Sequence, residues 1–65
     1  MKITVNGSLV DSTAGTLAAL LAELGKADDK VATAVNEAFV PAGARATHAL
    51  QDGDRVEIEE PRQGG

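Results

Sequence analysis

The residues of this sequence with the clearest chemical potential are the last two, Gly64 and Gly65. A terminal glycine carries the backbone carboxylate of the chain and has no side chain to shield it. Two glycines in a row also make a strip of backbone thin and flexible enough to enter a narrow channel in another protein. The α-carboxylate is ionised at neutral pH and is therefore a poor acyl donor as it stands. A cloning scar or a frayed tail would give the same ending. The rest of the sequence must therefore decide whether Gly64 and Gly65 have a function.

The size and composition of the chain restrict what it can do. Its 65 residues, of which 43% are hydrophobic and 25% charged, are typical of one small globular domain. Such a chain buries only about 60% of the surface that its unfolded form exposes, so we expect no deep active-site cleft. Because the sequence has no cysteine, it excludes disulfide frameworks, thiolate zinc sites, iron–sulfur ligation and a cysteine nucleophile. The net charge of −4 argues against a nucleic-acid ligand and suits a basic partner surface.

Two features bear on where the protein works. The N-terminal residues Met1 to Thr4 lack the apolar stretch of a secretory signal. The longest apolar run, from Leu17 to Ala22, is far shorter than the ~20 residues that span a bilayer. We therefore expect a cytoplasmic protein that does not contact a membrane.

The first half of the chain is predicted to form a β-hairpin and a helix. Residues Lys2 to Val5 alternate polar and apolar side chains, Asn6-Gly7 suits a type I′ turn, and a second strand follows around Ser8 to Val10. The apolar stripe of the helix, spaced at i, i+3, i+4 and i+7, consists of Leu17, Leu20, Leu21 and Leu24. Thr16 is the expected N-cap, with Ser12 and Thr13 as alternatives, and Gly25 is the expected C-cap.

The second half is predicted to add further strands. They comprise Val31 to Val35, Ala38 to Val40 and Arg55 to Glu59, with a turn at Asn36-Glu37 between the first two. Residues 42–49 show neither helical nor strand period and are interpreted as a loop with one irregular turn. Pro61 ends the last strand and leaves Arg62 to Gly65 as an exposed, mobile tail.

The order of these elements predicts an α+β fold. The connection through the helix favours two parallel strands with a right-handed crossover, and one leucine stripe can cover one face of a mixed four- to five-stranded sheet. This layout is the β-grasp, or ubiquitin-like, architecture. We expect a single domain over residues 1–61 and a flexible tail over residues 62–65. The expected core comprises Ile3, Val5, Leu17, Leu20, Leu21, Leu24, Val31, Val35, Leu50, Val56 and Ile58.

Five segments form a pattern that is specific in its order and spacing, although no segment is specific alone. They are Val5-Asn6-Gly7, Thr16 to Leu21, Val31 to Pro41, Leu50 to Ile58 and the final Gln63-Gly64-Gly65. Together they resemble the ThiS family, the bacterial sulfur carriers of thiamine biosynthesis. The resemblance covers nearly the whole chain. It departs from the family at Ala42 to Ala46, where relatives often carry a basic and an aromatic residue, and at Arg62, where many have an apolar one.

The resemblance implies a protein co-substrate rather than an enzyme, with no catalytic residue of its own. An adenylating enzyme of the ubiquitin-activating type would use Mg-ATP to convert the Gly65 carboxylate into an acyl-adenylate. A persulfide donor, such as a cysteine desulfurase, would then supply the sulfur of a thiocarboxylate for thiazole synthase. Arg62, Gln63 and Gly64 would thread into the partners' active sites. The chain itself would bind no metal or cofactor and would be a monomer when free.

Two other function classes remain open. The small subunit of molybdopterin synthase shares this fold and the Gly-Gly chemistry, but such chains usually have a larger segment between the first strand and the helix than Asn6-Gly7 allows. The second alternative is a plain β-grasp interaction module in which Gly-Gly is incidental. A neighbouring gene for thiazole synthase, for the large subunit of molybdopterin synthase or for neither would discriminate among the three.

Other residues have simpler interpretations. His48 is expected on a surface loop, because no oriented nucleophile accompanies it. Asp52-Gly53-Asp54 is expected to be a turn rather than a calcium site, and Gly15-Thr16 a helix start rather than an anion site. Phe39, the only aromatic residue, is interpreted as core, with docking on the open sheet as the alternative. A solvated acidic surface, part of which could meet a basic partner, is expected from Asp28, Asp29, Glu57, Glu59 and Glu60.

Overall fold

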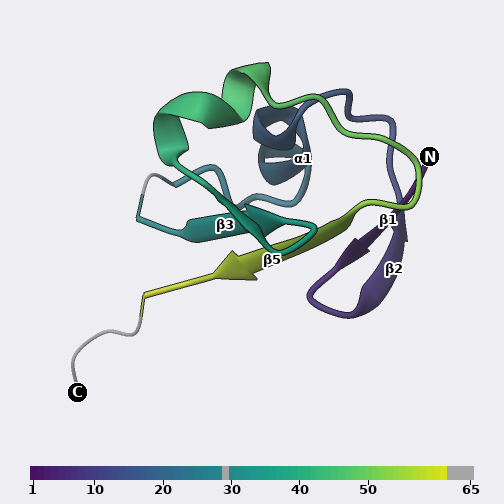
Figure 1. Cartoon of the computed structure of the whole chain (residues 1–65), viewed down its shortest axis with the longest axis horizontal. Coiled ribbons are helices and arrows are strands. Elements are labelled where there is room, and N and C mark those ends of the chain that lie inside the picture. The colour runs from purple at the N-terminus through teal and green to yellow at the C-terminus, as the bar shows by residue number, and fades with distance from the viewer. Residues whose placement is uncertain (29, 62–65) are drawn as a thin grey trace.

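The protein folds into a five-stranded sheet, an α-helix and a 3₁₀-helix (Figure 1). The structure is a computed structural model, and it describes residues 1–28 and 30–61. The strands are β1 (Lys2–Val5), β2 (Ser8–Asp11), β3 (Ala32–Val35), β4 (Ala38–Val40) and β5 (Arg55–Glu59). The helices are α1 (Leu17–Glu23) and the 3₁₀-helix η1 (Ala42–Thr47). Both helices lie on the same side of the sheet (Figure 1). The predicted α+β fold, with one main helix on a mixed sheet, is confirmed.

The last strand of the sequence lies at the centre of the sheet, whose order is β2-β1-β5-β3-β4. β1 and β5 are parallel, and the other neighbouring pairs are antiparallel. β2 and β3, which precede and follow α1, therefore point in the same direction, as the sequence predicts, but β1 and β5 lie between them. The handedness of this crossover stays a prediction. The central place of β5 matters because this strand leads to residues 62–65.

Asparagine turns close both hairpins. Asn6 and Gly7 have φ angles of 49° and 85°, which is the left-handed geometry that the sequence predicts for this turn. The turn between β3 and β4 has the same hand, with φ angles of 51° at Asn36 and 72° at Glu37. Asparagine tolerates this conformation better than most residues, because its short polar side chain can form local hydrogen bonds. Both turns place an asparagine side chain against the backbone of β5.

Helix α1 has the N-cap that the sequence predicts, whereas its C-cap is Leu24 and the expected C-cap, Gly25, is the next residue. Thr16 is the N-cap, and its hydroxyl accepts a hydrogen bond from the Ala19 amide at 3.2 Å. At the other end, the Lys26 amide donates to the Leu21 carbonyl at 2.8 Å, around Gly25 with its φ of 72°. This is the Schellman arrangement, in which glycine is favoured at the left-handed position.

The apolar core lies between α1 and the sheet. Its most deeply buried apolar side chains are Ile3, Leu17, Leu20, Leu21 and Val56. Most of the predicted core is confirmed, but Val5 and Leu24 are only partly buried, because Val5 adjoins the first turn and Leu24 caps the helix. Val40 and Ala14 are buried although the sequence did not indicate them.

The predicted loop over residues 42–49 is more regular than expected, because most of it forms η1. Arg45 within η1 is buried, with only 6% of its surface exposed. Its guanidinium donates to the Thr33 hydroxyl and to the carbonyl groups of Asp28 and Val31. A buried charge is tolerated only when its hydrogen-bonding groups are satisfied, and these bonds hold η1 against β3 and the segment before it.

Candidate functional site

The site expected from the sequence lies at the C-terminal end of the chain. Arg62, Gln63, Gly64 and Gly65 lie outside the described residues, so the roles and the mobility assigned to them stay predictions. The described part of the site is the platform that precedes them, formed by β5 and residues 60–61.

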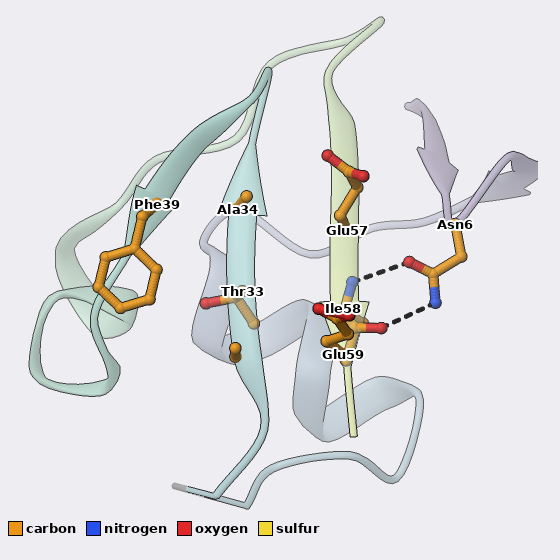
Figure 2. A pocket seen from close by; sticks show the side chains of 8 residues that line it. Asn6, Thr33, Ala34, Phe39, Glu57, Ile58 and Glu59 are labelled. Atoms are coloured by element: carbon orange, nitrogen blue, oxygen red, sulfur yellow. Dashed lines mark hydrogen bonds between the residues drawn. The ribbon is translucent and has the colours of Figure 1, made fainter. Parts of the chain in front are cut away.

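The end of β5 is held to distant parts of the chain at two points. The side-chain amide of Asn6 donates from Nδ2 to the Ile58 carbonyl at 3.0 Å, and its Oδ1 accepts from the Ile58 amide at 2.8 Å (Figure 2). Further along, the carboxylate of Glu60 forms an ion pair with Lys26, which lies just beyond the C-terminal end of α1. These contacts fix the position of the last described residues before the predicted tail.

Sequence reasoning identified Asn6 only as a turn residue and missed its contact with Ile58. Two features of Asn6 could have indicated such a contact: it follows the end of a strand, and its side chain carries both a donor and an acceptor. That signal does not name a partner, because the contact joins residues that are 52 positions apart. Only the strand order brings the two together.

The sheet face opposite α1, here called the open face, carries exposed apolar side chains. Phe39 on β4 is 70% exposed and Leu9 on β2 is 69% exposed. The interpretation of Phe39 as a core residue is therefore wrong. Val40 takes the inward position on β4, and successive side chains of a strand point to opposite faces, so Phe39 points outward. Exposed aromatic residues are enriched in protein-binding surfaces, which favours the docking alternative.

A shallow hollow of about 510 Å³ lies on the open face between Phe39 and Asn6 (Figure 2). Ala34 of β3 pairs with Phe39 on one side and with Glu57 on the other, so all three share this face. Glu57 and Glu59 are exposed and line the same hollow. The arrangement thus combines a fixed base for a chain end with an exposed surface that has an aromatic side and an acidic side. Such a surface is complementary to a partner that offers an apolar group beside a basic one.

The other candidate residues have structural roles. His48 caps η1 and is half-buried, and its carbonyl accepts a hydrogen bond from the Leu17 amide at 2.9 Å. Asp52 and Asp54 each accept a hydrogen bond from a backbone amide, at 2.7 and 2.8 Å, so the predicted turn around Gly53 is confirmed.

The described residues offer neither a candidate metal centre nor a membrane-spanning helix. Within residues 1–28 and 30–61, histidine and carboxylate side chains form no group of three or more that could hold a metal ion. Over these same ranges, no helix has both the length and the apolar composition needed to cross a membrane.

A protein family and solved structures resemble this chain. The ThiS family model matches residues 2–65. The crystal structure of the thiamine biosynthesis protein (ThiS) from Geobacter metallireducens is similar, with a TM-score of 0.82, 29% sequence identity and 100% of both chains covered. An NMR solution structure of a thiamine biosynthesis protein from Geobacter metallireducens has a TM-score of 0.80 and 28% identity, over 100% of this chain and 88% of that chain. No curated protein gives a significant match.

Proposed function

Because the chain belongs to the ThiS family of small sulfur carriers in thiamine biosynthesis, we propose that its C-terminal carboxylate carries the sulfur that enters the thiazole ring of thiamine. The observation that carries this proposal is the family match over residues 2–65, which includes Gly64 and Gly65. The β-grasp fold, shared with ThiS structures at TM-scores of 0.82 and 0.80, supports it. In this role the chain is a co-substrate, and its partners supply the catalytic residues.

The first step makes the terminal carboxylate reactive. An adenylating enzyme of the ubiquitin-activating type binds Mg-ATP, and a carboxylate oxygen of Gly65 attacks the α-phosphorus while pyrophosphate leaves. The product is an acyl-adenylate, in which AMP is a good leaving group. Gly64 and Gly65 suit this step because a backbone without side chains can be aligned in a narrow channel. ATP and magnesium belong to the partner, and the chain itself binds no cofactor.

The second step exchanges AMP for sulfur. The outer sulfur of a persulfide, held by a donor such as a cysteine desulfurase, attacks the acyl carbon, and the bond from that carbon to AMP breaks. A thiol then cleaves the resulting acyl disulfide, which leaves a thiocarboxylate on Gly65 and a new disulfide between the other two sulfurs. Since the chain has no cysteine, it brings no thiolate that could attack the acyl-adenylate from within. Thiazole synthase consumes the thiocarboxylate.

We assign partner recognition to the tail and to the open face together. Residues 62–64 thread into the active sites, and Phe39 contacts the partner surface around the channel entrance. Glu57 and Glu59 face basic groups there, in keeping with the net charge of −4. The chain works in this way as a monomer in the cytoplasm, without nucleic acid or membrane.

Growth of a bacterial strain that lacks its own thiamine sulfur carrier tests the proposal, with the cognate activating enzyme and thiazole synthase expressed alongside. The wild-type chain should restore growth without thiamine. Deleting Gly65 should abolish growth, because it moves the carboxylate back by roughly 3.3–3.6 Å in an extended chain. His48→Ala, which leaves the tail intact, is the control and should restore growth fully.

Two results would contradict this proposal. Growth with the deletion variant would leave a plain interaction module as the better interpretation. Failure of the wild-type chain to support growth without thiamine, together with rescue of a strain lacking the small subunit of molybdopterin synthase, would assign it to that enzyme instead.

A further inference from the structure

β5 extends further along the sheet than its parallel neighbour β1. The two strands pair only at Thr4–Arg55 and Val5–Val56, after which the chain turns at Asn6 towards β2. On its other side, β5 stays paired with β3 as far as Glu59. Residues 57–59 therefore have a strand on one side only, at the end of β5 that leads to the tail.

The side chain of Asn6 takes the place of the missing strand. It bonds both the amide and the carbonyl of Ile58, at 2.8 and 3.0 Å, while the backbone amide of Asn6 donates to the Val56 carbonyl at 2.9 Å (Figure 2). A carboxamide carries a donor and an acceptor in one plane, as a peptide group does. Asn6 thus extends the ladder between β1 and β5 by one residue beyond the point where β1 ends.

We propose that Asn6 is a positioning residue for the activation of the chain's C-terminal carboxylate. This inference rests on the proposed function. By keeping β5 paired at Ile58, Asn6 limits how many residues before Gly65 must be ordered when a partner takes up the tail. Each additional residue to be ordered lowers the association constant by a factor of roughly 5–30. The ion pair of Glu60 with Lys26 is a weaker tie, because both side chains are largely exposed, by 55% and 41%.

Loss of the Asn6 side chain should therefore affect uptake of the chain and not the chemical step. Once the tail is in place, the same carboxylate lies in the same channel, so the rate at saturation is unaltered. The KM for the chain in adenylation should rise while kcat stays constant. A general loss of the fold would be detected separately, as a lower midpoint of thermal unfolding.

A matched pair of variants separates positioning from ordinary stabilisation. Asn6→Gly removes the carboxamide but keeps the left-handed turn, since glycine adopts positive φ without strain. Asn36→Gly is the control. Asn36 has a similar φ of 51°, and its Oδ1 accepts a hydrogen bond from the Arg55 amide at 3.0 Å, at the start of β5 and away from the tail. We expect Asn6→Gly to raise KM about 5–30-fold and Asn36→Gly to leave KM and kcat unchanged.

A second variant, Asn6→Asp, tests the inference independently in case Asn6→Gly folds poorly. Asn6→Asp also tolerates the left-handed turn and keeps an acceptor for the Ile58 amide. It replaces the Nδ2 donor with a second acceptor opposite the Ile58 carbonyl, so it should raise KM as well.

Amide hydrogen exchange provides a readout that needs no partner enzyme. Exchange at Ile58 and Glu59 should accelerate in Asn6→Gly and stay unchanged in Asn36→Gly. An unchanged KM in Asn6→Gly, or an equal rise in both variants, would overturn the inference. If the wild-type chain is not adenylated at all, the proposed function fails. Unaltered exchange in Asn6→Gly would then show independently that Asn6 does not hold the strand end.

Discussion

The guanidinium of Arg45 donates from Nε to the hydroxyl of Thr33 at 3.2 Å, and both residues are buried. The Thr33 hydroxyl in turn donates to the Val40 carbonyl at 2.8 Å. The other hydrogen bonds of this guanidinium within the described residues go to the carbonyl groups of Val31 and Asp28. Arg45 therefore joins η1 to β3 and to the segment that leads from α1, and Thr33 continues the network to the backbone of β4.

Replacing Arg45 should weaken the fold. Arg45→Met fills similar space but leaves the buried carbonyl of Val31 without its donor, at a cost of about 1–3 kcal/mol in the free energy of unfolding. Arg45→Lys should not restore stability, because one ammonium group does not reproduce the planar fork of donors. Urea unfolding followed by circular dichroism measures both effects. Arg55→Met, at an exposed position on β5, is the control, and a variant at Arg45 as stable as this control would contradict the assignment.

The leucine stripe of α1 should account for a large share of the stability. Leu21 is 1% exposed, so Leu21→Ala should lower the free energy of unfolding by about 2–5 kcal/mol through lost burial and the cavity left behind. Leu9→Ala makes the same chemical change at a side chain that is 69% exposed, and it should change stability by less than about 0.5 kcal/mol. Equal losses in the two variants would show that the core is not where the structure places it.

The sequence predicts the local elements well and the contacts between them poorly. The strands at Lys2–Val5 and Arg55–Glu59 were predicted correctly, because alternation is a property of each segment alone. Phe39 was misassigned because a three-residue strand has too short a pattern to show which face is inward. The burial of Arg45 depends on carbonyl groups that lie far from it in the sequence, so no local period reveals it.

The predicted site likewise has one part that the sequence indicates and one part that depends on the fold. The chemistry proposed for Gly65 comes from the resemblance of the sequence to the ThiS family, and no fold is needed to propose it. The hollow beside Phe39 and the contact between Asn6 and Ile58 arise only when β3, β4, β5 and the first turn come together in the sheet. The sequence therefore names Phe39, Glu57 and Glu59 as candidates for a docking surface but does not show that they lie around one hollow.

Phe39 should contribute to partner binding and little to stability. Because its side chain is exposed, Phe39→Ala should leave the free energy of unfolding within about 0.5 kcal/mol of the wild type. Aromatic anchors in interfaces often contribute more than about 1 kcal/mol, so the Kd for the activating enzyme should rise at least about fivefold. Titration calorimetry measures this change. Leu9→Ala is equally exposed but outside the hollow, and it should bind normally; an unchanged Kd for Phe39→Ala would remove the open face from the interface.

Asp11 should titrate below its ordinary range. The Lys2 ammonium donates a hydrogen bond to the Asp11 carboxylate at 3.3 Å, and the N-terminal ammonium lies 3.5 Å from it. These contacts, that of Lys2 above all, hold the pKa of Asp11 below its ordinary value of 3.8. Their contribution to stability is therefore fully present above pH 3.8 and is lost as the pH falls through the lowered pKa. An NMR titration should show the lowered midpoint in the wild type and a higher one in Lys2→Met; identical midpoints would contradict the assigned cause.

The central claim, that Gly65 carries the transferred sulfur, is tested most directly by intact-mass spectrometry. The chain is incubated with its activating enzyme, Mg-ATP, a persulfide donor and a thiol, and release of pyrophosphate confirms that the enzyme is active. The wild-type mass should increase by the difference between one sulfur and one oxygen atom, and fragmentation should place the change at Gly65. A chain with alanine added after Gly65 should show no increase, because its former carboxyl carbon is part of an amide. An unchanged wild-type mass despite an active enzyme, or an equal increase in the extended chain, would contradict the account.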